Sequence, residues 1–308
     1  MDAHQMAEWV DRIDKAFGGK GGIVGGDHLM DLIKHEQAMS RHLKRQFRGY
    51  LRLMDAFFDF YVETFRETSG REETKWPEKI IIFTLTHVAT LWRLRASYSC
   101  FWNGYYEDAK GLLRAVLENA LTIAALQWQA IEVKELFGDG ASLQRSNLSE
   151  EKIYKLIRRR ISECDNKVRS AIIGPGSGLS SDAQRDLDLF VQGLHMAVHK
   201  GQTNFLWGYK RWVYKQPLPF FPPWDESLAS LYLNSSAFLG WMILRTLPLL
   251  QLEDGEFSDR WLKRYHVLDE SFKDMVADFP KHLGRSVEEL LQKKFDFADT
   301  LIRTQRDN

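Results

Sequence analysis

The chain has 308 residues, of which 44% are hydrophobic and 27% charged, a composition typical of folded globular proteins and unlike that of long disordered chains. Its 42 Lys and Arg residues balance 42 Asp and Glu residues, so any nucleic-acid site has to be a local patch rather than a global positive field. Cys100 and Cys164 form no CxxC unit and indicate neither a disulfide framework nor a thiolate zinc site.

The N-terminal segment combines an apolar helical stripe over residues 1–18 with acidic residues throughout, unlike a secretory signal. The glycine-rich residues 18–26 follow and predict a hinge. A phosphate-binding loop is excluded because Lys20 is followed by Gly21 instead of Ser or Thr. We therefore expect a cytoplasmic protein in which a short helix is tethered to a single helical-bundle domain over residues 27–308.

Apolar residues recur at helical spacing over almost all of the remaining chain, and strand-like alternation is nearly absent. The predicted helices span residues 27–68, 78–101, 105–137, 150–173, 225–250, 258–279 and 285–305, with a further helix that begins at a capping box of Ser181 and Gln184. These elements predict an all-α bundle of about eight or nine helices with a long aromatic-rich loop.

The charge-free run from Ser227 to Leu244 approaches the length of a membrane span. It contains polar residues, among them Asn234 and Ser236, which are costly in hydrocarbon. We expect a buried core helix here and no membrane span.

Two charged residues stand on the most apolar predicted helix, 105–137. Because this helix is apolar on nearly all sides, Arg114 and Glu118 are expected in a core, where an unpaired charge costs several kcal/mol. Their i, i+4 spacing allows them to pair with each other. The pair serves either the fold or a functional site.

His195 and His199 lie one turn apart, on the same flank as Asp188 and Gln192. A carboxylate beside an imidazole can orient it for proton transfer, although histidines at a core boundary give the same pattern. The HExxH motif of zinc proteases is absent, because Met196 follows His195. No Glu-x-x-His unit, the motif of di-iron helical bundles, occurs either. We predict no metal and no cofactor.

Cations and aromatic residues are interleaved in the loop after His199. They either bind bases and phosphates or plug the end of the bundle. The candidate binding residues are Trp207, Tyr209, Lys210, Arg211, Trp212 and Tyr214. Arg93 and Arg95 form a second candidate, because the antiparallel helix brings them near Tyr105 and Tyr106, or else they mark a solvated helix end.

The segments "LLRAVLENA" and "LHMAVHKG" resemble a family of uncharacterised bacterial all-helical proteins with an Arg-x-x-x-Glu helix and a later helix ending in His. That family is distantly similar to the HEPN superfamily, which includes metal-independent ribonucleases of toxin–antitoxin and phage-defence systems. The resemblance covers residues 78–202. HEPN ribonucleases carry an Arg five to seven positions before the His, whereas here Arg185 lies ten residues before His195 and fourteen before His199.

The resemblance therefore requires Arg114, from another helix, to replace that arginine. It implies His199 as the general base, His195 as its assistant, Arg114 as the phosphorane-stabilising cation and Glu118 as the residue that holds Arg114. It also implies that RNA is the substrate and that the protein is a homodimer.

The competing interpretation is a non-catalytic module that binds a protein or nucleic acid, as a regulatory or sensing subunit. The residues alone leave the choice between enzyme and binding module open.

Overall fold

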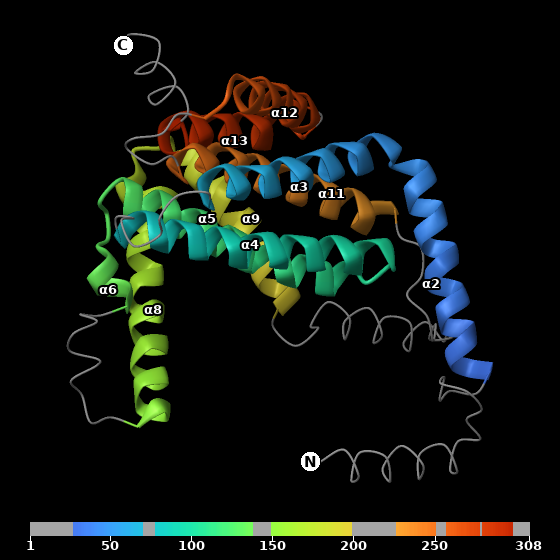
Figure 1. The fold of residues 1–308 in the computed structure, drawn as a ribbon, viewed down its shortest axis with the longest axis horizontal. Helices are drawn as coiled ribbons and strands as arrows, with labels where there is room; N and C mark the ends of the chain where they lie inside the picture. Colours follow the sequence, from blue (N-terminus) through green and yellow to red (C-terminus); the bar gives the residue numbers. More distant parts are fainter. Residues whose placement is uncertain are drawn as a thin grey trace.

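The computed structural model describes residues 27–69, 78–137, 149–198, 226–250, 257–277 and 279–297. In these ranges the chain forms ten α-helices, two short 3-10 helices and no strand (Figure 1). The predicted all-α helical bundle is confirmed. The predicted N-terminal helix, the glycine hinge, the loop with its six candidate binding residues, and His199 all lie outside the described ranges.

The helices follow one another along the chain as α2 (Asp27–Gln46), α3 (Arg48–Ser69), α4 (Glu78–Trp102), α5 (Tyr106–Gln127), α6 (Val133–Phe137), α8 (Glu150–Ile172), η2 (Pro175–Ser177), α9 (Ser181–Val198), α11 (Glu226–Thr246), η3 (Leu247–Leu250), α12 (Asp259–Ala277) and α13 (Lys281–Lys294).

Helix α5 is the central element of the bundle. It packs against α4, α8, α9 and α11, which are blue-green, yellow-green, yellow and orange in Figure 1. Its apolar residues are buried on most sides, including Leu113, Val116, Ala120 and Ile123. The prediction of a helix surrounded by the rest of the bundle is confirmed.

Two predicted helices are each divided in the structure. The predicted helix 27–68 becomes α2 and α3, with a break at Phe47 beside Gly49, and α2 bends away from α3 (Figure 1). The predicted helix 105–137 ends at Gln127, because Gln129 adopts a left-handed conformation with φ of 55°. The amide of Ala130 then donates to the carbonyl of Ala125 at 2.9 Å, which closes the end of α5 as a Schellman motif does.

Helix α11, with the 3-10 turn after it, is long and apolar enough to span a bilayer. However, 72% of its most apolar window is buried inside the bundle. It packs chiefly against α5 and α12, in agreement with the predicted core helix.

The start of α9 differs from its prediction by one residue. The amide of Ala183 donates to the Ser180 hydroxyl at 3.3 Å, so Ser180 is the N-cap instead of Ser181. Gln184 donates to the carbonyl of Leu179 at 2.8 Å and takes no part in a capping box. Ser180 also donates through its amide (2.7 Å) and its hydroxyl (2.6 Å) to the Glu289 carboxylate, and therefore fixes α9 to α13.

A buried histidine joins α3 to α4 within the core. His87 is fully buried, and its Nδ1 lies 2.7 Å from the hydroxyl of Tyr61. That hydroxyl also donates to the main-chain carbonyl of His87 at 3.1 Å. Burial lowers the pKa of His87 to about 3, so this imidazole is neutral in the folded protein at physiological pH.

Candidate functional site

Helices α5, α8 and α9 enclose a pocket of about 200 Å³ that contains three of the four predicted catalytic residues. Arg114 and Glu118 come from α5 and His195 comes from α9. The fourth residue, His199, lies outside the described part of the chain. Residues 81 positions apart, Arg114 and His195, therefore line one cavity because α9 packs along α5.

The Arg114–Glu118 pair forms as its spacing predicts, with 2.7 Å between Nε and Oε1. Its position differs from the prediction of a buried core pair. The Arg114 side chain is 23% exposed and that of Glu118 44% exposed, because both face the pocket instead of the interior. The bidentate-capable guanidinium is therefore held in place and remains open to a bound group.

Helix α8 adds three polar residues to the pocket that the sequence analysis did not identify, namely Asp165, Asn166 and Arg169. Desolvation and the neighbouring Glu118 carboxylate raise the pKa of Asp165, while Arg114 and Arg169 oppose the shift. Two carboxylates and two guanidiniums thus act on each other across the pocket. In the sequence, the i, i+4 spacing of Asp165 and Arg169, the same as that of Arg114 and Glu118, was the signal that could have identified them.

Asp188 has partners other than those expected for a carboxylate that orients a histidine. Its Oδ1 accepts from Arg169 at 3.1 Å, and its Oδ2 accepts from Gln192 at 2.6 Å. Asp188 lies outside the pocket lining, in a neighbouring depression that shares Arg169. It holds one of the two pocket guanidiniums and so acts on the pocket through Arg169.

The pocket combines groups for proton exchange with groups that stabilise anionic charge. An imidazole can accept or donate a proton near neutral pH, and guanidinium groups can bind the oxygens of a phosphate. Among the described residues, no group of three or more His, Cys, Asp or Glu side chains is placed to hold a metal ion. The chemistry that this part of the pocket offers is acid–base and electrostatic.

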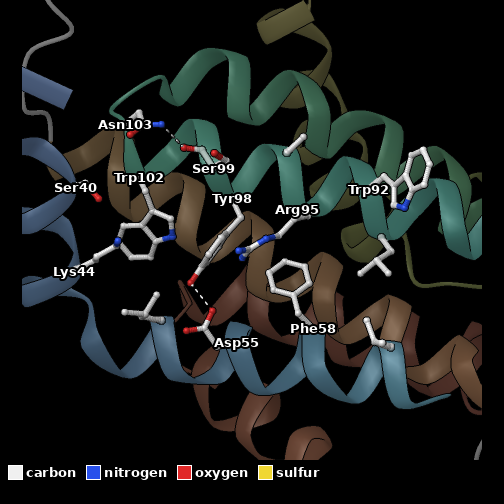
Figure 2. Close-up of a pocket in the computed structure, with 14 residues that line it drawn as sticks. Ser40, Lys44, Asp55, Phe58, Trp92, Arg95, Tyr98, Ser99, Trp102 and Asn103 are labelled. Carbon is white, nitrogen blue, oxygen red and sulfur yellow. Dashed lines mark hydrogen bonds between the residues drawn. The ribbon is translucent and has the colours of Figure 1, made fainter. Parts of the chain in front are cut away.

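A second and larger concavity, of about 1010 Å³, lies between α2, α3 and α4 (Figure 2). We call it the α3–α4 groove. Its lining includes Lys44, Phe58, Trp92, Arg95, Tyr98 and Trp102. Arg95, a predicted binding residue, lies with its guanidinium carbon 5.3 Å from the ring centroids of both Phe58 and Tyr98.

The predicted cluster of Arg93 and Arg95 with Tyr105 and Tyr106 does not form, and Arg95 packs on Phe58 and Tyr98 instead. Tyr105 donates a short hydrogen bond to Glu36, and Tyr106 is buried in the core, so neither ring is the one that Arg95 contacts. Arg93 is exposed on α4 and lines neither concavity.

No protein-family model, curated protein or solved structure matches the chain. The resemblance to HEPN proteins consequently stays a prediction that rests on two short motifs.

Proposed function

We propose that the protein is a HEPN-like, metal-independent ribonuclease whose active site is the pocket between α5, α8 and α9. The observation that supports this function is the convergence of Arg114, Glu118 and His195 on one cavity from two helices that are far apart in sequence. Two of these residues lie in one of the motifs on which the resemblance rests, and the third lies in the other.

The reaction needs a base, a cation and an acid. A histidine takes the proton from the ribose 2′-hydroxyl, whose oxygen attacks phosphorus, and the bond from phosphorus to the 5′-oxygen breaks as that oxygen gains a proton. His199 is the proposed base and His195 its partner in proton exchange. Arg114 stabilises the charge on the phosphorane, and Glu118, 2.7 Å from Arg114, keeps the guanidinium oriented.

The size of the pocket favours a small reacting group. Its volume of about 200 Å³ is below the roughly 300–1,000 Å³ of most small-molecule sites. It would admit a phosphodiester and its ribose, while the rest of the RNA stays outside.

Cleavage of mixed cellular RNA in the presence of a chelator tests the proposal. We expect His195→Ala to lower the rate by about 10²- to 10⁴-fold, because one proton-transfer group is lost. The matched control is His266→Ala, which removes an exposed histidine on α12. Cleavage that is absent in the native protein, or equal in both variants, would overturn the proposed function.

A binding module is the second candidate function. The α3–α4 groove favours it, because a concavity of this size lined by rings and cations suits recognition without requiring catalysis. In that case the native protein binds a partner and releases no RNA fragments, and His195→Ala leaves binding unchanged.

A further inference from the structure

We propose that the α3–α4 groove binds single-stranded nucleic acid, with bases on the Trp92 ring and the Arg95 guanidinium and phosphates on the basic surface beside it. This inference concerns a different surface from the pocket and does not depend on whether the pocket cleaves RNA. It follows from the charge next to the groove, from the rings within it and from their arrangement.

The basic surface lies where α2 meets α3. Residues 40–52 carry five cations and no Asp or Glu, in a protein whose overall charge is zero. All five are exposed, and none has an ion pair among the described residues: Arg41, Lys44, Arg45, Arg48 and Arg52. Lys44 lines the groove itself. Such a surface attracts a polyanion.

The groove presents one large flat ring to solvent, that of Trp92, while the rings of Phe58, Tyr98 and Trp102 are buried in its wall. Trp92 is 73% exposed although it is the largest type of apolar side chain. Its exposure contributes nothing to the stability of the fold. Tyr98 and Trp102 pack edge to face with centroids 5.3 Å apart and support the wall from the core side. Trp92 is therefore the ring on which a base can stack.

Arg95 connects these rings in the middle of the groove, as Figure 2 shows. Its guanidinium lies near both Phe58 and Tyr98 and is therefore held against the wall. Tyr98 is fixed in turn by donating to Asp55 Oδ1 at 3.1 Å. The groove thus presents a guanidinium held in place by buried rings, close to the exposed ring of Trp92.

Unpaired bases suit this surface better than an acidic protein does. An acidic peptide would satisfy Lys44 and its neighbouring cations but offers few flat rings for Trp92. A duplex supplies phosphates but keeps its bases stacked on one another. A single strand offers both phosphates and free base faces at regular spacing.

The test measures fluorescence anisotropy of a labelled single strand of about 12 nucleotides, a length within the range that such sites cover. One arm uses 2′-O-methyl oligouridylate and the other the matching deoxyoligonucleotide. Neither carries a 2′-hydroxyl, so the proposed cleavage reaction cannot remove the probe. Binding by both arms indicates recognition of bases and phosphates, and binding by the first alone indicates preference for an RNA-like sugar.

We expect Trp92→Ala to raise Kd roughly five- to hundredfold, the loss typical of one stacked base. The matched control is Trp128→Ala, which removes a half-exposed tryptophan outside the groove and should leave Kd unchanged. Lys44→Gln should reduce the slope of log K against log salt by about 0.7. Lys263→Gln, on the exposed face of α12, should not change that slope.

Three results would overturn the inference. They are no binding of either strand by the native protein, equal losses in Trp92→Ala and Trp128→Ala, and displacement of the strand by polyglutamate at equal charge concentration. The last result would assign the groove to an acidic protein partner. Circular dichroism confirms that each variant is folded, so a loss of binding is not a loss of structure.

Discussion

The pocket and the α3–α4 groove use arginine in opposite ways. In the pocket each guanidinium is paired with a carboxylate, Arg114 with Glu118 and Arg169 with Asp188. In the groove Arg95 lies against aromatic rings, and the five cations of residues 40–52 have no carboxylate partner among the described residues. A paired guanidinium is oriented but largely neutralised, whereas an unpaired one keeps its attraction for distant anions.

This difference separates two tasks. The pocket has little net charge to draw a polyanion from solution, yet it holds polar groups in fixed positions around a small volume. The groove has the charge and ring surface to capture a strand but no histidine among its lining residues. We therefore expect that chemistry and capture can be removed independently.

The largest expected effect is on chemistry alone. Arg114→Gln should lower RNA cleavage by about 10²- to 10³-fold, because it removes the cation that faces the developing charge. Affinity for the non-cleavable strand should stay the same. Arg159→Gln is the matched control, since Arg159 forms the same kind of i, i+4 pair with Glu163, at 2.8 Å, on the exposed part of α8. If Arg114→Gln weakened strand binding as well, the two regions would form one continuous site.

A second prediction separates the effect of low pH on the stability of the fold from its effect on the pocket or the α3–α4 groove. The pKa of His87 is lowered to about 3 by burial, whereas an unfolded histidine has a pKa of about 6.5. Below about pH 6.5 His87 therefore binds a proton in the unfolded chain but not in the native state. The free energy of unfolding falls as the pH drops through this range. At pH 5 the loss from this group is about 2 kcal/mol.

Denaturant titrations at pH 7 and pH 5 measure this loss. In His87→Gln the histidine contribution to the difference between the two pH values should disappear, although the variant is less stable at both. An unchanged difference would show that other groups control the acid response. Any activity lost at pH 5 could then not be ascribed to this part of the fold.

The smallest expected effect tests whether global stability alone changes either activity. A Cβ at Gly240 would lie 2.9 Å from Cε1 and Cζ of Phe272, where α11 meets α12. Gly240→Ala should lower the free energy of unfolding by about 1–2 kcal/mol, since overpacking outweighs the gain in helix propensity.

Thermal melting measures this change, and both activities should survive at low temperature. Gly193→Ala is the matched control, because a Cβ there meets nothing within 4 Å, and it should be neutral or slightly stabilising. Equal melting temperatures for the two variants would contradict the packing argument.

Hydrophobic periodicity predicted the fold well because it reports burial directly. The central position of α5 followed from its lack of a polar face. The break after Gln127 did not, because the left-handed residue is Gln129 and the usual glycine signal is absent. The cap at Ser180 was missed because the capping-box pattern fits Ser181, which Gln184 follows by three residues, whereas Ala183 stands at that position after Ser180.

The pocket was only partly predictable for a different reason. Arg114 and Glu118 stood out because charge is conspicuous on an apolar helix. Asp165 and Arg169 belong to α8, a helix with charges along its length, where functional and solvated side chains look alike. Which of those charges faces α5 and α9 depends on how the helices pack, and periodicity on one helix does not specify that.

The contact of Ser180 with Glu289 has a mechanical consequence for His195. The carboxylate accepts two hydrogen bonds from Ser180 and another from Lys293, which together hold the pKa of Glu289 at about 2. The Glu289 carboxylate therefore stays charged across the physiological pH range. Fifteen residues, or about 22 Å of stiff helix, separate Ser180 from His195. Helix α9 packs along α5, and its N-terminal end is fixed to α13, so α13 helps to set the axial position of an imidazole near the opposite end of the helix.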